Sequence, residues 1–192
     1  MDKFYIELKE WLSTRVGKKR YNHSLNVADE AVKLAERYGE HKENAYFAGL
    51  MHDCCKELST EELKKIVISS DMDVDEAELI TKPLWHAIAG AEYVRANFPD
   101  TDKEIISAIR FHTIGKAKMS VFEQIIYIAD MISAERDFDG VEKLRKLAYI
   151  SLDNTMLECV KFSLVKVINK NGFLPEYSLK AYNYYLKKSG VN

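Results

Sequence analysis

The stretch AGLMHDCCKE, residues 48–57, joins an apolar helical segment to a run of polar and titratable side chains. Residues 48–51 are typical of the inner face of a helix, yet His52 and Asp53 follow at once, and two cysteines and a lysine come next. A carboxylate carried into a protein core is costly unless it is paired or coordinates a metal. The stretch therefore indicates a helix whose end brings polar groups to a specific site in the core.

Working outward from this stretch, the apolar spacing is helical along nearly the whole chain. Apolar stripes end at Gly17 and at Gly39, and Gly39 stands where a helix C-terminal stop is expected. Capping-box patterns open three further segments: Ser59 with Glu62, Thr101 with Glu104, and Ser120 with Glu123. The segments 152–168 and 178–186 are again amphipathic, and no alternating strand pattern is evident. We expect an all-α protein with a single domain, residues 1–192, of roughly ten helices.

Composition restricts the class of protein. The chain has 192 residues, 47% of them hydrophobic and 30% charged, with a formal net charge of -2. Neither charge sign dominates, so we expect no nucleic-acid partner and no membrane-surface role. No segment has the length or composition of a signal peptide or a membrane span. Three cysteines, two of them adjacent, form a poor disulfide framework, which favours a reduced cytoplasmic protein.

Polar residues also interrupt other apolar helical segments. These residues are His23, His86, His112 and Asp130, whereas His41 lies in a polar segment typical of the surface. One alternative is that each histidine is simply hydrogen-bonded in the core and that Asp130 pairs with Arg110 or Arg136. That alternative needs a separate explanation for each residue. A single divalent first-row metal, bound by imidazoles and carboxylates, explains them together.

Seven motifs carry a resemblance to a known family. They are RYNHS (20–24), AGLMHDCCK (48–56), HAIAGA (86–91), AIRFHTIG (108–115), IIYIADMIS (125–133), ERDFDGVEKLR (135–145) and KAYNYY (180–185). This ordered set resembles the HD-domain superfamily of metal-dependent phosphohydrolases, and within it the YqeK-type symmetrical diadenosine-tetraphosphate hydrolases. The resemblance implies an all-helical HD fold with a motif core at about 18–135 and C-terminal helices that complete the nucleotide pocket. The pairs Cys54–Cys55 and Ser133–Ala134 depart slightly from the pattern.

The resemblance implies a metal site held by His23, His52, Asp53 and Asp130. Iron is the metal that it favours, while manganese, cobalt and zinc remain alternatives. His86 and His112 match positions on the substrate side, where they contact phosphate or ligate a second ion with Asp53 as a bridge. We favour phosphate contact and one ion, because four ligands already complete a first ion.

The resemblance also implies the residues that act on the substrate. Asp53 and Lys56 are the predicted catalytic residues, with Lys56 on the side of His52 as a phosphate anchor. His23, Asp53, His86, His112, Thr113 and Arg136 complete the predicted phosphate-binding set, and Arg20 either contacts phosphate or pairs with a buried acid. A loop over the nucleotide is predicted at Phe173, Leu174, Pro175, Glu176, Tyr177 and Ser178, with Ser178 as the N-cap of the last helix. A simple interhelix turn is the alternative for this segment.

The function implied is hydrolysis of a dinucleoside tetraphosphate between its central phosphates to give two nucleoside diphosphates, ADP from diadenosine tetraphosphate. The alternatives are another HD phosphohydrolase, such as a nucleotidase or a cyclic-dinucleotide phosphodiesterase, and a helical metal-binding or nucleotide-binding module without catalysis. The GYP signature of the cyclic-dinucleotide enzymes is absent from the sequence. A homodimer is compatible with the sequence.

Overall fold

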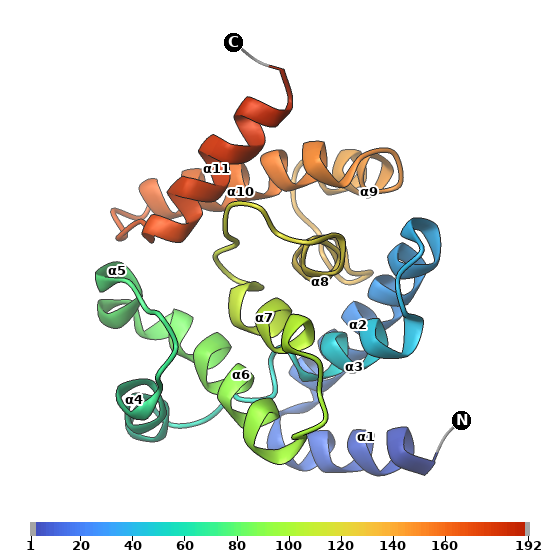
Figure 1. Ribbon diagram of the computed structural model, residues 1–192, viewed down its shortest axis with the longest axis vertical. Helices are drawn as coiled ribbons and strands as arrows, with labels where there is room; N and C mark the ends of the chain where they lie inside the picture. Colours follow the sequence, from blue (N-terminus) through green and yellow to red (C-terminus); the bar gives the residue numbers. More distant parts are fainter. Residues whose placement is uncertain (1–2, 191–192) are drawn as a thin grey trace.

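The computed structural model describes residues 3–190, and all the regular secondary structure within that range is helical (Figure 1). The elements are α1 (Lys3–Arg15), α2 (Lys18–Tyr38), α3 (Lys42–Met51), α4 (Thr60–Ser69), α5 (Glu76–Ile80), the 3₁₀ helix η1 (Lys82–Leu84), α6 (Trp85–Asn97), α7 (Lys103–Phe111), α8 (Val121–Ile132), α9 (Val141–Ala148), α10 (Leu152–Ile168) and α11 (Glu176–Lys188). The prediction of an all-α fold is confirmed.

Most of the helix signals act as the sequence predicts. Ser59 and Ser120 each form a complete capping box, and Gly39 ends α2 in the left-handed conformation at φ 79°. Two predicted caps are wrong. Asp102 caps α7 in place of Thr101, because its carboxylate accepts from the backbone N–H of Glu104. Ser178 lies inside α11, and its hydroxyl donates to the carbonyl of Ile114 instead of capping the helix.

The segment between α4 and α6 contains two short elements that the sequence reading missed. Asp75 and Glu78 form a capping box that opens the five-residue helix α5. Pro83 stands in the first turn of η1, where a missing N–H costs little. These elements are too short for an apolar period to reveal them.

Helix α8 lies in the middle of the fold, and α2, α3, α7, α9 and α10 all pack against it. In Figure 1, α9, α10 and α11 lie above α8, while α6 and α7 lie below it. One continuous hydrophobic core runs from Leu8 in α1 to Tyr185 in α11. Among residues 3–190, no helix combines the length and apolar character needed to cross a bilayer.

Gly49 sets the distance between α3 and α2. A Cβ atom at this position would lie 2.5 Å from the Cα of Ala28, so any larger residue would push the two helices apart. The close approach of the backbones places the end of α3 beside the first half of α2. As a result, His52 comes within contact distance of His23.

Candidate metal centre

Four buried histidines from four helices meet at one place in the core. His23 comes from α2 and His86 from α6, while His52 and His112 are the residues directly after α3 and α7. The Nε2 atoms of His23 and His52 lie 3.3 Å apart, and those of His86 and His112 lie 3.2 Å apart. The structure therefore brings together the four histidines that the sequence placed in apolar helices.

The other ring nitrogen of each histidine fixes its tautomer. Nδ1 of His52 donates to the carbonyl of Gly49 at 2.7 Å, that of His86 to Pro83 at 2.7 Å, and that of His112 to Ile109 at 2.7 Å. Nδ1 of His23 donates to the carboxylate of Glu135. With the proton on Nδ1, each Nε2 presents a lone pair toward the same centre.

Asp53 lies between the two histidine pairs. Its Oδ2 atom is 3.4 Å from Nε2 of His52 and 3.7 Å from Nε2 of His23, while Oδ1 is 3.1 Å from Nε2 of His86. Burial alone would raise the pKa of Asp53, but His52, His112 and His86 around it hold that pKa well below its usual range. Oδ1 is buried and has no hydrogen-bond partner among the described residues. Asp53 thus stays ionised and offers an oxygen to each pair.

Asp130 completes the centre from α8. Its Oδ1 atom lies 3.0 Å from Nε2 of His23, and Arg136 binds the same oxygen. Burial opposes ionisation, but the hydrogen bond with His23 and the charge of Arg136 keep the pKa of Asp130 below its usual value. The side chain is 16% exposed, so Asp130 is largely buried. Of the two arginines considered as partners for Asp130, Arg136 is the one in contact.

The donor set fits a divalent metal ion. Two groups have all their donor atoms within 4.8 Å of one another: His23, His52 and Asp130, and His52, Asp53 and His112. Nε2 lone pairs that face each other at 3.2 and 3.3 Å repel one another, and a divalent cation bound among these donors removes that repulsion. Although burial lowers the pKa of His52, the carboxylates of Asp53 and Asp130 raise it overall, so this place favours positive charge.

Burial instead lowers the pKa of His86 to about 4, and it also lowers the pKa of His112. Both imidazoles are therefore neutral near neutral pH, as metal binding or hydrogen bonding to a cation requires.

Three cationic side chains lie beside the donors: Arg136, which binds Asp130, and Lys56 and Arg20. Lys56 places Nζ 2.9 Å from Nε2 of His86 and 3.8 Å from Oδ1 of Asp53, and burial lowers its pKa. Arg20 donates from Nη1 to Oδ2 of Asp53, so it pairs with a buried acid, one of the two roles expected for it. Helix α3 ends at Met51, and Lys56 lies in the turn that follows it, where its backbone N–H donates to the carbonyl of Asp53. This turn, rather than the spacing of a helix, places Lys56 beside the donors.

Residues outside the predicted set hold the centre in place. The carboxylate of Glu135 accepts hydrogen bonds from three side chains: from His23, from Asn26 at 2.6 Å and from Ser133 at 2.8 Å. Arg145 of α9 donates to the carbonyls of Ser133 at 2.9 Å and Arg136 at 2.8 Å, which fixes the loop after α8. The sequence reading missed Glu135. Its place directly before Arg136 in the quoted motif ERDFDGVEKLR is the signal that could have identified it.

A mostly apolar cavity of about 590 Å³ reaches Thr113, the chain neighbour of His112, and Pro83, whose carbonyl binds His86, and we call it the apolar cavity. Four of the predicted nucleotide-binding residues line it: Thr113, Phe173, Pro175 and Ser178. The hydroxyl of Thr113 is buried without a hydrogen-bond partner among the described residues.

The remaining residues predicted for the nucleotide loop do not line this cavity. Leu174 packs against the hydrophobic core. The backbone N–H of Glu176 donates to Asp75 at 2.7 Å, and the hydroxyl of Tyr177 donates to Asp73 at 2.5 Å. These two contacts tie the start of α11 to the segment before α5.

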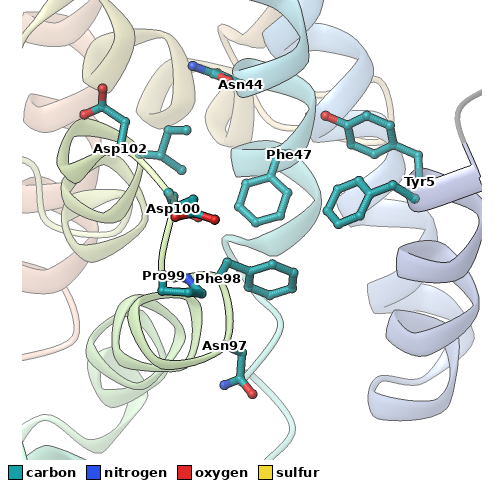
Figure 2. A pocket seen from close by; sticks show the side chains of 11 residues that line it. Tyr5, Asn44, Phe47, Asn97, Phe98, Pro99, Asp100 and Asp102 are labelled. Carbon is teal, nitrogen blue, oxygen red and sulfur yellow. The ribbon is translucent and has the colours of Figure 1, made fainter.

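A different cavity, of about 520 Å³, lies away from the histidines between α1, α3 and the loop after α6 (Figure 2). Aromatic rings form much of its wall, among them Phe47 and Phe98, whose centroids lie 5.2 Å apart. Its charged side chains are Asp100 and Asp102, and no lysine, arginine or histidine lines it. Two carboxylates repel phosphate, so this cavity does not suit a nucleotide.

Comparisons with known proteins agree with this geometry. The family model described as the HD domain matches residues 20–135. A curated Bacillus subtilis protein named bis(5'-nucleosyl)-tetraphosphatase, symmetrical, is 37% identical over 79% of this chain and 81% of its own length. A Staphylococcus aureus protein of the same name is 34% identical over 92% of each chain.

A solved structure gives the same result for the fold. The crystal structure of a predicted HD superfamily hydrolase involved in NAD metabolism, from Clostridium acetobutylicum, superposes with a TM-score of 0.91. It is 38% identical and the match covers 96% of this chain and 97% of that one. The convergent histidines, the paired carboxylates and these matches together show that the chain belongs to the HD-domain family.

Proposed function

We propose that this protein is a metal-dependent hydrolase that cleaves dinucleoside tetraphosphates between the two central phosphates. The names of the relatives support this activity. The observation that carries it is the pairing of a metal-donor cluster with three cations, Lys56, Arg20 and Arg136, at its edge. A chain of phosphates requires this combination, because negative charge builds on its oxygens as the bond breaks.

A divalent ion bound by the donors would lower the pKa of a water molecule and polarise a phosphate oxygen. The side chains of the protein supply the rest. Lys56 neutralises charge on the phosphate under attack, and Arg136 offers a planar fork to the next phosphate along the chain. Asp53 orients the donors, because its two oxygens face the two histidine pairs.

We further propose that the metal is iron and that one ion is bound, by His23, His52, Asp53 and Asp130. Support for a single ion comes from Lys56, whose ammonium group lies beside Nε2 of His86 and supplies positive charge where a second ion would be needed. His86 and His112 then lie on the phosphate side without an ion of their own, and Nε2 of His86 accepts a hydrogen bond from Lys56. Elemental analysis of the purified protein tests this proposal: one iron per chain supports it, and two ions per chain contradict it.

The apolar cavity is the place we propose for the nucleoside. Its volume of about 590 Å³ lies in the range of small-molecule sites. Thr113 stands at the boundary between this cavity and His112, and its unpaired hydroxyl is available to a ligand. Helices α10 and α11 supply the far wall, so the C-terminal part of the chain completes the pocket.

Hydrolysis of diadenosine tetraphosphate in oxygen-18 water tests the cleavage position. A nucleoside diphosphate held in the apolar cavity leaves its terminal phosphorus beside the donors, and that phosphorus is the second from the nucleoside. We expect one labelled and one unlabelled ADP per turnover. AMP together with ATP would mean that the chain is shifted by one phosphate, and no turnover would favour a binding module.

A further inference from the structure

A second cavity, of about 430 Å³, adjoins the metal centre and shares no lining residue with the apolar cavity. We call it the basic cavity. It lies between α2, the loop after α8, and α10, and its lining residues are Lys19, Arg20, His23, Met131, Glu135, Arg136, Asp137, Phe138, Phe162 and Lys166. We propose that the basic cavity binds the second nucleoside diphosphate, the half of the substrate that leaves. This inference rests on the proposed function.

The two cavities reach different members of the donor cluster. The apolar cavity includes Pro83, whose carbonyl holds His86, and Thr113, the neighbour of His112. The basic cavity includes His23 itself and Arg136, the partner of Asp130. A tetraphosphate that crosses the donors therefore has one nucleoside end in each cavity.

The charges of the basic cavity suit phosphate. Four cations line it against two carboxylates, and one of those carboxylates, Glu135, already accepts from His23, Asn26 and Ser133. The side chains of Lys19 and Lys166 are exposed and make no ion pair with any residue of the described part of the chain. They come from α2 and α10, on two walls of the cavity, and are available to an anionic ligand.

The same cavity contains a surface for a base. The rings of Phe138 and Phe162 stack with centroids 4.5 Å apart and planes 28° apart, and both rings are partly exposed. Aromatic side chains at the wall of a basic groove bind nucleobases by stacking, with little dependence on which base is present. The basic cavity thus offers cations near the centre and aromatic rings beside them, in one continuous lining.

Cleavage at the central bond explains why a second subsite is needed. The oxygen of water forms a bond to one central phosphorus, and the bond from that phosphorus to the bridging oxygen breaks. The electron pair leaves on the bridging oxygen as part of the second nucleoside diphosphate, and the proton of water passes to solvent. Negative charge therefore grows on the leaving diphosphate, beside Arg136.

Equilibrium binding of ADP to the metal-loaded enzyme tests the subsite without turnover. We expect calorimetry to give two ADP molecules per chain for the unaltered protein. The double variant Lys19→Glu, Lys166→Glu should bind one, and its KM for diadenosine tetraphosphate should rise by roughly tenfold or more, as for loss of hydrogen bonds to charged groups. Lys161→Glu is the matched control, because it reverses another exposed lysine of α10 outside the cavity.

The outcomes separate the two proposals. One ADP per chain in the unaltered protein, or two in the double variant with an unchanged KM, would overturn the subsite while leaving central cleavage intact. Failure of the unaltered enzyme to form ADP from diadenosine tetraphosphate would contradict the proposed function. In that case the number of ADP molecules bound would still decide whether the basic cavity holds a nucleotide.

Discussion

Two buried polar clusters begin two residues apart at the end of α7, and they differ in how their polar atoms are paired. The guanidinium of Arg110 donates to both carboxylate oxygens of Glu78, at 2.7 and 3.0 Å, and to the carbonyl of Asp73 at 2.8 Å. His112 instead points its Nε2 atom toward His86 and Asp53, with its proton held on the far side of the ring.

The difference shows which buried polar groups indicate a ligand. Arg110 and Glu78 neutralise each other inside the protein and fix the segment around α5 against α7, so their role is structural. The histidine cluster instead leaves Oδ1 of Asp53 without a hydrogen-bond partner among the described residues, and it turns Nε2 lone pairs toward one another. We call Arg110 with Glu78 the closed cluster, and the four histidines with Asp53 and Asp130 the open cluster. Both clusters are buried, and only the incompletely paired atoms of the open cluster indicate a metal and a substrate.

The largest effect is expected from Asp130→Ala, which breaks the open cluster. The variant removes an oxygen donor and leaves Arg136 without its carboxylate, so we expect loss of the bound metal and of all measurable turnover. The helical core should still form, because Asp130 lies at the edge of the core with 16% of its side chain exposed. Metal content and circular dichroism measure the two effects, and full metal occupancy would contradict the ligand assignment.

Arg110→Ala breaks the closed cluster and should act on stability instead. It leaves Glu78 as an uncompensated buried charge, which typically costs about 3–5 kcal/mol in the free energy of unfolding. Urea denaturation measures this loss. The metal content of the folded fraction should stay at that of the unaltered protein, because Arg110 contacts none of the donors.

A second variant sharpens the test of the closed cluster. Replacing both partners, as Glu78→Leu with Arg110→Met, removes the two charges together, and such exchanges of buried pairs are often neutral or stabilising. We expect the double variant to recover most of the stability that Arg110→Ala loses. A double variant as unstable as the single one would show that the contact with the Asp73 carbonyl, and not the ion pair, holds the segment.

The sequence predicted the helices and the inner residues of the site, and it failed where tertiary contacts decide. Ser59 and Ser120 cap their helices because a capping box is complete within four residues. Ser178 has the right type for a cap, but its hydroxyl is bound by Ile114, 64 residues away in the chain. Local patterns cannot report a partner at such a distance.

The same distinction holds within the site. The four histidines were predictable because a polar residue on an apolar helical face is visible in the pattern. Glu135 supports His23 from 112 residues away, and its own surroundings in the sequence are polar, so only its place directly before Arg136 marked it. The contacts of Glu176 and Tyr177 with Asp75 and Asp73 depend likewise on how α11 meets the segment before α5.

Lys56→Ala tests the cationic edge of the open cluster and should have an intermediate effect. The metal donors remain, so the metal content should be unchanged. The rate should fall on the order of 10²-fold, as for the loss of one donor to a developing negative charge. Single-turnover kinetics with diadenosine tetraphosphate measure the chemical step. A rate equal to that of the unaltered protein would mean that Lys56 only neutralises Asp53 and His86 in the absence of substrate.

The smallest effect is expected from Thr113→Val, which probes an unpaired group at the rim of the open cluster. Because the Thr113 hydroxyl has no partner among the described residues, its removal breaks no hydrogen bond within the protein. It removes only a bond to the substrate, worth about 0.5–1.5 kcal/mol, so KM should rise by roughly two- to twelvefold. Thr155→Val is the matched control, because the buried Thr155 hydroxyl donates to the Ser151 carbonyl at 2.8 Å. That variant should lose about the same free energy from folding and leave KM unchanged. If Thr113→Val lowered stability and left KM alone, the Thr113 hydroxyl would have to be bound within the protein, and the apolar cavity would lose its one polar contact beside His112.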